Sequence, residues 1–377
     1  MKFSFIVLVL LSWSSLEAKP FLDITRHGLE QYQDIVIDNK VVKRATNNHN
    51  DCKSRYRAIK KVLARFKRPF TLLDLGASQG YYSFRGAFDF PQGVFVMIEG
   101  NNVHYPLIGS QLQDLCLANR RLSNVIFLNR SLVPTELETL SQCEHFDVVL
   151  ALNILHWFKD DWVKMLDAIL QMGYCVIVET PPIETCVLQE DNQLRQNIIH
   201  SLQQVGAKLL AKVPRHTSQA ESCLFLCRGK AAYLKKKTWL SPEMPEKTHK
   251  IVCTFRKKLL EKPLYGRPGE LAVSQWIPGI NLLTFKMYSG TYPKKSVLLK
   301  GLRQLRKVSH NDWTINNMII QGKRLSFIDF NDPEHDPGQV GGTRLCTPSV
   351  FASHKELMGI LDPEQVREFF WQKLAQD

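Results

Sequence analysis

Short apolar runs separated by helix-like stretches constrain the fold of this chain more than any other feature. The runs cover residues 70–75, 94–99, 124–128, 146–152 and 174–179, and helix-like stretches occupy 106–119 and 160–172. Each run has the length and composition of a strand that is buried on both faces. Strands that alternate with helices predict right-handed crossovers, so we expect a doubly wound α/β fold with a parallel sheet.

The length of the chain predicts a second domain. A single hydrophobic core stops growing at roughly 250–300 residues, and this chain has 377. The apolar pattern predicts a lead-in helix at 56–66, a helix at 189–205, and strands at 208–213 and 223–227 that could close the first sheet. The sequence then becomes basic and rich in proline after Gly229. We therefore predict a first domain over 55–229 and a small α+β domain over 230–377.

Charge and cysteine content limit the classes of function. The 49 Lys and Arg residues against 36 Asp and Glu leave a net charge of +13, which favours an anionic partner. Nine cysteines at irregular intervals do not have the even pattern of a disulfide framework. Cys223 and Cys227 lack a second Cys or His pair at zinc-ligand spacing, so we expect them on one strand.

The first 18 residues have the pattern of a secretory signal peptide. Lys2 precedes an apolar run from Phe3 to Trp13, and Ala18 is the small residue at the cleavage position. This run is shorter than the roughly 20 residues that span a bilayer, and no later segment is long enough. The pattern predicts an exported or lumenal protein with a lead-in at 19–54. The alternatives are an uncleaved membrane anchor, or a buried N-terminal helix in a cytoplasmic protein.

The first candidate site is the turn that follows the run at 70–75. Asp74 lies near the end of this run, and Gly76 and Gly80 stand in the turn, where the absence of a Cβ lets a ligand approach the backbone. The next run ends in Glu99, whose carboxylate can accept hydrogen bonds from both hydroxyls of a ribose. Together these residues predict a crevice that binds a nucleoside.

The turn departs from the G-x-G-x-x-G pattern of dinucleotide-binding proteins, which disfavours a dehydrogenase. The segment Leu73-Asp-Leu-Gly-Ala-Ser-Gln-Gly-Tyr81 instead resembles the first motif of class I S-adenosylmethionine-dependent methyltransferases. The segment 146–157 is similar to their fourth motif. The resemblance covers about residues 55–229 and implies a Rossmann-like methyltransferase domain with S-adenosyl-L-methionine as its cofactor.

The resemblance also implies roles for the residues around the turn. Asp74, Gly76 and Gly80 would hold the methionine end of the cofactor. Glu99 would hold the ribose, and Asn129 or the arginine after it would meet the adenine.

Three further residues would lie at the mouth of the site, with Asn153 next to the cofactor and His156 and Trp157 beyond it. His156 is the available general base, since a histidine ordinarily has a pKa of about 6.5. The alternative is a packed histidine that caps the strand. Methyl transfer from a sulfonium needs mainly proximity and alignment, so no protein nucleophile is required.

A second candidate site lies near the C-terminus. The sequence His310-Asn-Asp312 is followed by Asn317, and the later run 325–330 contains Asp329. This spacing resembles the H-x-D-x-x-x-x-N catalytic loop and the metal-binding Asp of the protein-kinase-like fold, especially its aminoglycoside phosphotransferase branch. The resemblance implies that Asp312 accepts the proton of a substrate hydroxyl and that Asn317 and Asp329 hold Mg²⁺ on ATP.

The second candidate site also departs from the kinase pattern. No glycine-rich loop appears between residues 230 and 269, and the lysine that would contact the phosphates is ambiguous among Lys235, Lys257 and Lys258. Few residues follow Phe330 to build a helical lobe. The domain could be a minimal kinase or a pseudokinase.

The combination of the two motif sets resembles the bacterial O-antigen chain-terminating methyltransferase-kinases. It implies a methyltransferase that acts on a small hydroxylated or phosphorylated acceptor, such as a glycan end, and a kinase-like domain that phosphorylates or binds that acceptor. The sequence leaves the oligomeric state open.

Two other classes of function compete with this interpretation. One is an exported binding protein that kept both folds without catalysis, because ATP and S-adenosylmethionine are scarce outside cells. The other is a nucleic-acid methyltransferase, which is disfavoured because the Lys235-Lys-Lys237 run lacks interleaved aromatic residues. Asn129-Arg-Ser131 is the only N-glycosylation sequon, and a glycan there would block the predicted cofactor site.

Overall fold

The computed structural model describes residues 32–45, 51–101, 106–131, 133–182, 189–215, 218–231, 236–239, 271–274, 277–305 and 318–327. Several predicted features lie outside these ranges: the signal peptide at 1–18, the phosphate-contact candidates Lys235, Lys257 and Lys258, and the site residues Asp312, Asn317 and Asp329. Within the described ranges, no helix combines the length and the apolar character needed to cross a membrane.

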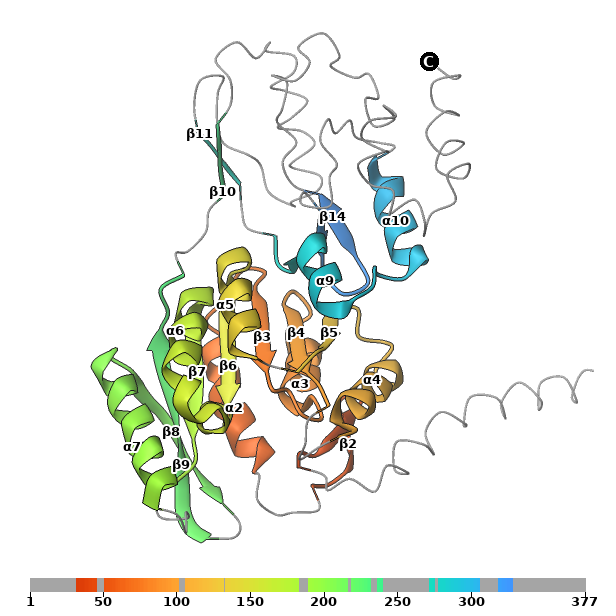
Figure 1. Ribbon diagram of the computed structural model, residues 1–377. Coiled ribbons are helices and arrows are strands. Elements are labelled where there is room, and N and C mark those ends of the chain that lie inside the picture. Colours follow the sequence, from red (N-terminus) through yellow and green to blue (C-terminus); the bar gives the residue numbers. More distant parts are fainter. Residues whose placement is uncertain are drawn as a thin grey trace, which may run out of the picture.

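A seven-stranded sheet in the order β5-β4-β3-β6-β7-β9-β8 forms the centre of the protein (Figure 1). Its strands are β3 (Thr71–Leu75), β4 (Val94–Glu99), β5 (Val125–Asn129), β6 (Phe146–Leu152), β7 (Gly173–Thr180), β8 (Lys208–Arg215) and β9 (Ser218–Arg228). The strands from β5 to β7 are parallel. The first strand of this set, β3, is central, so the chain builds the sheet in one direction and then in the other.

The sheet is mixed, which corrects the expectation of a parallel sheet. β9 runs antiparallel to β7, and β8 runs antiparallel to β9. β8 ends at Arg215 and β9 begins at Ser218. A connection this short makes a hairpin, because a parallel pair needs a crossover of about a dozen residues.

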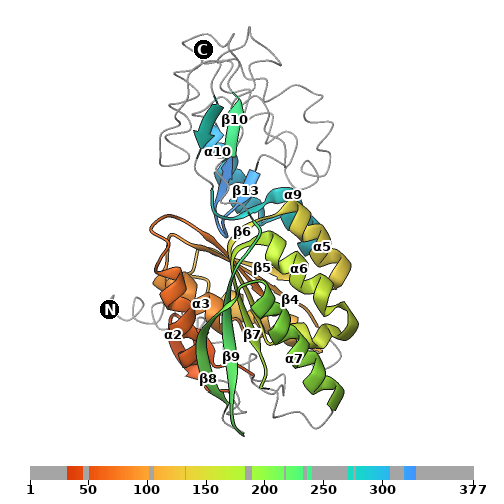
Figure 2. The same cartoon turned by 90° about the vertical axis from the view of Figure 1, so that its left-hand side faces the viewer.

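Helices cover both faces of the sheet (Figure 2). One face carries α2 (Cys52–Leu63), α3 (Tyr81–Asp89) and α4 (Ile108–Ala118), and the other carries α5 (Pro134–Cys143), α6 (Trp162–Met172) and α7 (Gln189–Gln204). In β3, Leu72 joins the core of the first face, whereas Leu73 and Leu75 join the core of the second. Burial of both faces explains the continuous apolar runs in the sequence.

A hairpin that the sequence did not predict precedes α2. It consists of β1 (Ile35–Ile37) and β2 (Lys40–Lys43), joined by Asp38 and Asn39 at φ 47° and 64°. Positive φ values at two central residues are typical of the tight turns that match the twist of a hairpin. Ile35 and Val36 are buried in the core beneath α3 and α4.

The second part of the chain combines helices with antiparallel strands. A three-stranded sheet has the order β12 (Ile280–Asn281), β13 (Met318–Ile320), β14 (Leu325–Phe327), and α9 (Leu282–Ser289) and α10 (Lys295–Leu305) accompany it. A separate ribbon pairs β10 (Lys236–Trp239) with β11 (Leu271–Ser274).

This second part sits on the amino ends of the parallel strands. The Gly279 amide donates a hydrogen bond to Oγ1 of Thr71, the first residue of β3, at 2.7 Å. The Asn281 amide donates to Oε1 of Glu144, just before β6, at 2.8 Å. Both contacts lie at the edge opposite the turn after β3.

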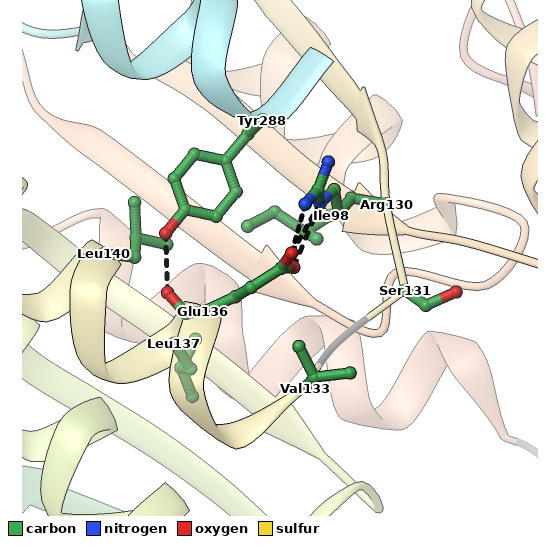
Figure 3. Close-up of a pocket in the computed structure, with 8 residues that line it drawn as sticks. All are labelled: Ile98, Arg130, Ser131, Val133, Glu136, Leu137, Leu140 and Tyr288. Atoms are coloured by element: carbon green, nitrogen blue, oxygen red, sulfur yellow. Dashed lines mark hydrogen bonds and ion pairs between the residues drawn. The ribbon is translucent and has the colours of Figure 1, made fainter. Parts of the chain in front are cut away.

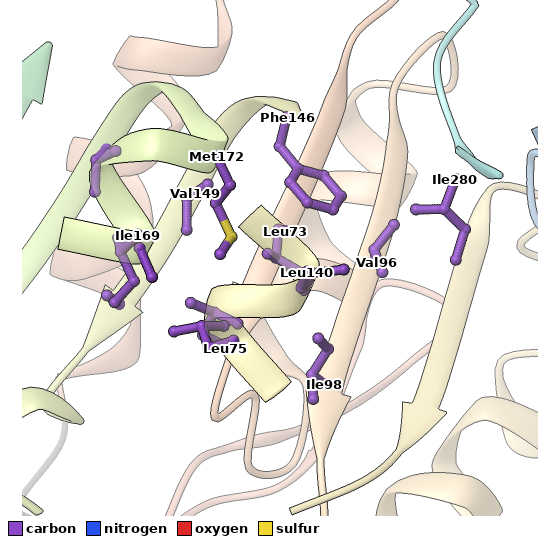
Figure 4. Packing of buried hydrophobic residues seen from close by; sticks show 14 of the residues in the cluster. Leu73, Leu75, Val96, Ile98, Leu140, Phe146, Val149, Ile169, Met172 and Ile280 are labelled. Carbon is purple, nitrogen blue, oxygen red and sulfur yellow. The ribbon is translucent and has the colours of Figure 1, made fainter. Parts of the chain in front are cut away.

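The two parts of the chain also share a hydrophobic core. Ile280, from β12, belongs to the same buried cluster as Val96 and Phe146 of the large sheet (Figure 4). From the β13–β14 turn, the Lys323 amide donates to the carbonyl oxygen of Ser123 at 2.9 Å. The described residues of the second part therefore pack directly on the first, although the composition changes sharply between them.

Glu144 is a buried carboxyl at this contact. It is 3% exposed and lies beside the start of α9, where Asn281 is the N-cap residue. Burial raises the pKa of Glu144 to about 7, against the opposing effect of hydrogen bonds from Thr284 and from the Asn281 amide. Because this pKa is raised in the folded protein, the stabilisation it brings is complete below the ordinary value of 4.5 and is lost as the pH rises through about 7.

The substitution Glu144→Gln tests this contact, because the amide keeps an accepting oxygen for Asn281 and cannot ionise. We expect the stability of the variant relative to wild type to improve by roughly 1–3 kcal/mol between pH 5 and pH 8. Urea unfolding of both proteins at each pH measures the difference. A difference that stays constant over this range would contradict the raised pKa.

Candidate functional site

The turn after β3 has a left-handed backbone at every second residue. Gly76, Ser78 and Gly80 have φ of 66°, 53° and 72°. The amides of Gly76 and Ala77 both donate to the carbonyl oxygen of Ile98, at 3.0 and 3.3 Å. The turn is thereby folded over the carboxyl end of β4.

Both predicted glycines are required by close contacts as well as by φ. A Cβ at Gly76 would lie 2.7 Å from Cγ2 of Ile154, which follows β6. A Cβ at Gly80 would lie 2.8 Å from Cε2 of Phe84 and 2.9 Å from Cδ1 of Leu112. The contact with Ile154 brings the turn after β3 next to the loop after β6. This is the switch point of the sheet, where doubly wound proteins bind ligands.

Glu99 ends β4 and faces the turn. Its Oε2 accepts a hydrogen bond from the Ser78 amide at 2.8 Å, and its Oε1 accepts one from the Gly100 amide at 3.1 Å. Burial raises the pKa of Glu99, and these two hydrogen bonds oppose the shift. A carboxylate has about four acceptor positions, so two stay available for a ligand.

Asp74 lies beneath the turn. It is fully buried, and its Oδ2 accepts a hydrogen bond from Oγ of Ser83, in α3, at 2.7 Å. Burial raises the pKa of Asp74 to about 7; the Ser83 hydrogen bond lowers it and the charge of Glu99 raises it further. Asp74 therefore ties β3 to α3 from beneath the turn.

The structure distinguishes between Asn129 and Arg130, the two candidates for contact with adenine. Asn129 pairs with Glu99 in the β4–β5 register, and its Oδ1 lies 2.4 Å from the position of a Cβ on Gly109 in α4. It is therefore on the same face as the turn. Successive strand residues point to opposite faces, and Arg130 turns to the other face, where it forms an ion pair with Glu136.

On that other face, Arg130 lines a small pocket next to the second part of the chain (Figure 3). The hydroxyl of Tyr288, in α9, donates to the carbonyl oxygen of Glu136 at 2.5 Å. The remaining lining residues are Ile98, Ser131, Val133, Leu137 and Leu140. Since Arg130 is committed to Glu136, Asn129 is the residue that lies toward the crevice.

Asn153 follows β6 in a left-handed conformation, with φ of 56°. It is 8% exposed, and its amide donates to the carbonyl oxygen of Glu179 at 3.1 Å. Its Oδ1 is buried without a hydrogen-bond partner. Left-handed conformations outside glycine and unsatisfied buried polar atoms are both concentrated at functional sites, so this acceptor is a candidate ligand contact.

His156 and Trp157 lie on the 3₁₀ helix η2 (Leu155–Asp161), which begins two residues after Asn153. Their rings are tilted against each other with centroids 5.1 Å apart. Trp157 is 57% exposed, whereas His156 is half-buried. This region offers an imidazole and an apolar surface to an acceptor. Among the described residues, no group of three or more His, Cys, Asp or Glu could hold a metal ion.

Several polar residues near the crevice were not predicted from the sequence. Arg55, in α2, donates to Glu179 at the end of β7 through Nε and Nη2, at 2.7–3.0 Å, and both side chains are buried. Gln79 is fully buried and donates to Oε1 of Gln111 at 3.2 Å. The two partners of each pair are distant in the sequence, so no local sequence pattern predicts these contacts.

No family model and no curated protein matches this sequence. Among solved structures, the chain is similar to the bifunctional kinase-methyltransferase WbdD, with 17% identity and a TM-score of 0.40 over 74% of this chain and 76% of that chain. It is similar to the N-terminal domain of EvdMO1 with SAH bound, with 14% identity and a TM-score of 0.37 over 52% of this chain and 90% of that chain. It is also similar to the mitomycin 7-O-methyltransferase MmcR, with 16% identity and a TM-score of 0.32 over 48% of this chain and 59% of that chain. WbdD and MmcR are methyltransferases, and the EvdMO1 domain has SAH bound.

Substituting Gly76 tests the turn. Gly76→Ala adds a Cβ in a left-handed conformation and in contact with Ile154, so we expect a loss of roughly 2–4 kcal/mol in the free energy of unfolding. Gly206→Ala is the matched control, because Gly206 has φ of 74° with nothing within 4 Å of its Cβ position. It should lose only about 1–2 kcal/mol. Equal losses in the two variants would show that the contact with Ile154 is unimportant.

Proposed function

We propose that this protein is an S-adenosylmethionine-dependent methyltransferase. The observation that carries the proposal is the left-handed turn of Gly76, Ser78 and Gly80, set against the carboxylate of Glu99 at the switch point of the sheet. Two glycines keep the backbone accessible, and an acid ends the neighbouring strand where a ribose would lie.

The charges and acceptors of the crevice fit this cofactor. Glu99 has acceptor positions left for two ribose hydroxyls, and its acidic side chain favours a ligand that carries a sulfonium and an ammonium group. Asn129 lies on the same face, where an adenine would extend from the ribose. The buried Oδ1 of Asn153 provides an acceptor for a donor of the bound molecules.

The acceptor would bind beyond Asn153. S-adenosylmethionine would supply an electrophilic methyl group, and the protein has to align an acceptor oxygen and remove its proton. His156 would take that proton at a ring nitrogen, and the exposed ring of Trp157 would contact the acceptor. We infer a small hydroxylated or phosphorylated acceptor, such as a glycan end, in keeping with the net charge of +13.

Glu99→Gln tests the cofactor site. The amide keeps one acceptor for the Ser78 amide but loses the charge, so we expect affinity for S-adenosylmethionine, measured by calorimetry, to fall by about 10- to 100-fold. Glu190→Gln, an exposed acid in α7, is the control and should bind like wild type. Equal affinity in all three proteins would refute the assigned site.

We infer that the second part of the chain binds ATP and magnesium and either phosphorylates the acceptor or binds it. Asp312 would accept a hydroxyl proton, and Asn317 and Asp329 would hold the metal. In support, the β13–β14 hairpin begins directly after Asn317 and ends two residues before Asp329. Met318 pairs with Phe327, so the chain enters and leaves this hairpin at the same end.

Thermal unfolding in the presence of ATP and magnesium tests this inference. At an ATP concentration a hundredfold above its Kd, we expect the midpoint of wild type to rise by about 5 °C or more and that of Asp329→Ala to stay unchanged. Asp160→Ala, at an exposed acid in the first part, should shift like wild type. A wild type that does not respond would rule out phosphotransfer by this chain.

The second candidate function is an exported binding protein that lacks both activities. The signal-like segment at 1–18 favours it, and we infer on the same ground that the protein is exported or lumenal. Fractionating cells and sequencing the N-terminus of the purified protein distinguishes an exported or lumenal protein, which would lack residues 1–18, from a cytosolic protein that begins at Met1. A wild-type protein that binds neither S-adenosylmethionine nor ATP would favour the function of a binding protein without catalysis.

A further inference from the structure

The segment that precedes α2 packs against α3 and α4 and reaches the turn after β3. We name residues 32–45, which include β1 and β2, the strap. The strap is fastened at its turn: the Asp38 amide donates to Oδ1 of Asn119 at 3.1 Å, and Arg85 Nη1 donates to the carbonyl oxygen of Asn39 at 2.7 Å. Nδ2 of Asn119 also donates to the carbonyl oxygen of Val36 at 2.8 Å. These contacts attach the strap to α3 and to the end of α4.

At the start of the strap, Gln33 makes a reciprocal contact with the glycine turn. Its amide donates to Oε1 of Gln79 at 2.9 Å, and its own Oε1 accepts from the amide of Tyr81 at 3.0 Å. Gln33 is 4% exposed. Oε1 of Gln79 accepts from Oγ of Ser78 as well, at 2.7 Å. Gln33 is thus joined to the turn through both its main chain and its side chain.

The Tyr81 amide that donates to Gln33 lies at the position where many nucleotide-binding proteins contact a phosphate. Tyr81 is the first residue of α3, the helix that follows the central strand. In doubly wound dinucleotide-binding proteins, the amides at the start of this helix hold a pyrophosphate. Here the Tyr81 amide is bonded to Gln33 and the Ser78 amide to Glu99. Two of the amides that a diphosphate would meet at this turn are therefore occupied.

The negative charge next to the turn also disfavours a diphosphate. The carboxylate of Glu99 accepts the Ser78 amide of the turn, and its charge raises the cost of bringing a phosphate close to the turn. A nucleoside with a cationic substituent meets no such repulsion. The two occupied amides and the carboxylate of Glu99 together discriminate between ligands that share the same adenosine.

We propose that Gln33 is a specificity-determining and positioning residue of the crevice. Its side-chain oxygen closes the start of α3 to a diphosphate and holds the turn in the shape that presents Glu99 to a ribose. The crevice accordingly takes adenosine compounds that lack a diphosphate and excludes dinucleotides. This inference rests on the proposed nucleoside site and identifies what restricts its ligands.

The test compares wild type with Gln33→Ala and Gln33→Glu, using S-adenosylhomocysteine and NAD⁺ as calorimetric probes and amide hydrogen exchange of residues 76–84. Wild type should bind S-adenosylhomocysteine and not NAD⁺. Gln33→Ala should bind S-adenosylhomocysteine about tenfold more weakly and exchange faster in the turn, because it lacks the acceptor for Tyr81. Gln33→Glu keeps an oxygen there and should stay within about threefold of wild type.

Gln321→Ala is the matched control, since Gln321 also accepts a side-chain hydrogen bond, from Ser326, but on the opposite edge of the sheet. It should leave affinity and exchange in the turn unchanged. If amide exchange in the turn of Gln33→Ala equals that of wild type, Gln33 does not have the proposed role, whichever ligand binds. The same conclusion follows if Gln33→Glu loses as much affinity for S-adenosylhomocysteine as Gln33→Ala. NAD⁺ binding by wild type as tight as that of S-adenosylhomocysteine overturns the exclusion. Faster exchange in Gln33→Ala without any ligand binding by wild type would instead refute the methyltransferase function and support the contact.

Discussion

The carbonyl oxygen of Ile98, at the end of β4, accepts the first two amides of the turn after β3, and this contact fixes the turn on the carboxyl end of β4. It folds the turn back so that the Ser78 amide reaches Glu99. It also requires left-handed backbone at Gly76 and brings that residue against Ile154. The loops after β3, β4 and β6 are thus held together by main-chain bonds and by the absence of a Cβ.

The amino edge of the same sheet supports the second part of the chain. Amides of Gly279 and Asn281 are satisfied by Thr71 and Glu144, which belong to the first part, and Ile280 between them completes the core of the large sheet. The crevice and this docking surface therefore occupy opposite edges of the sheet. Because a closely packed core transmits strain, a change at one edge can affect the stability of the other.

The strands were predicted to within a few residues because burial on both faces makes them continuous apolar runs. Among the helices of the first part, α5 was not predicted. This helix is short and largely polar, so it carries no clear apolar periodicity. The β1–β2 hairpin was missed because β2, with the sequence Lys-Val-Val-Lys, is mostly exposed.

The sequence by itself determined the alternation of strands and helices, the positions of Gly76 and Gly80, and the acid at the end of β4, because each follows from the local residue pattern. Only the tertiary structure decided the antiparallel hairpin of β8 and β9, the choice of Asn129 over Arg130 on the crevice side, and the contact of Gln33 with the turn. It also decided where the second part docks. These features depend on pairing between segments that are distant along the chain, and such pairing is decided by packing rather than by local composition.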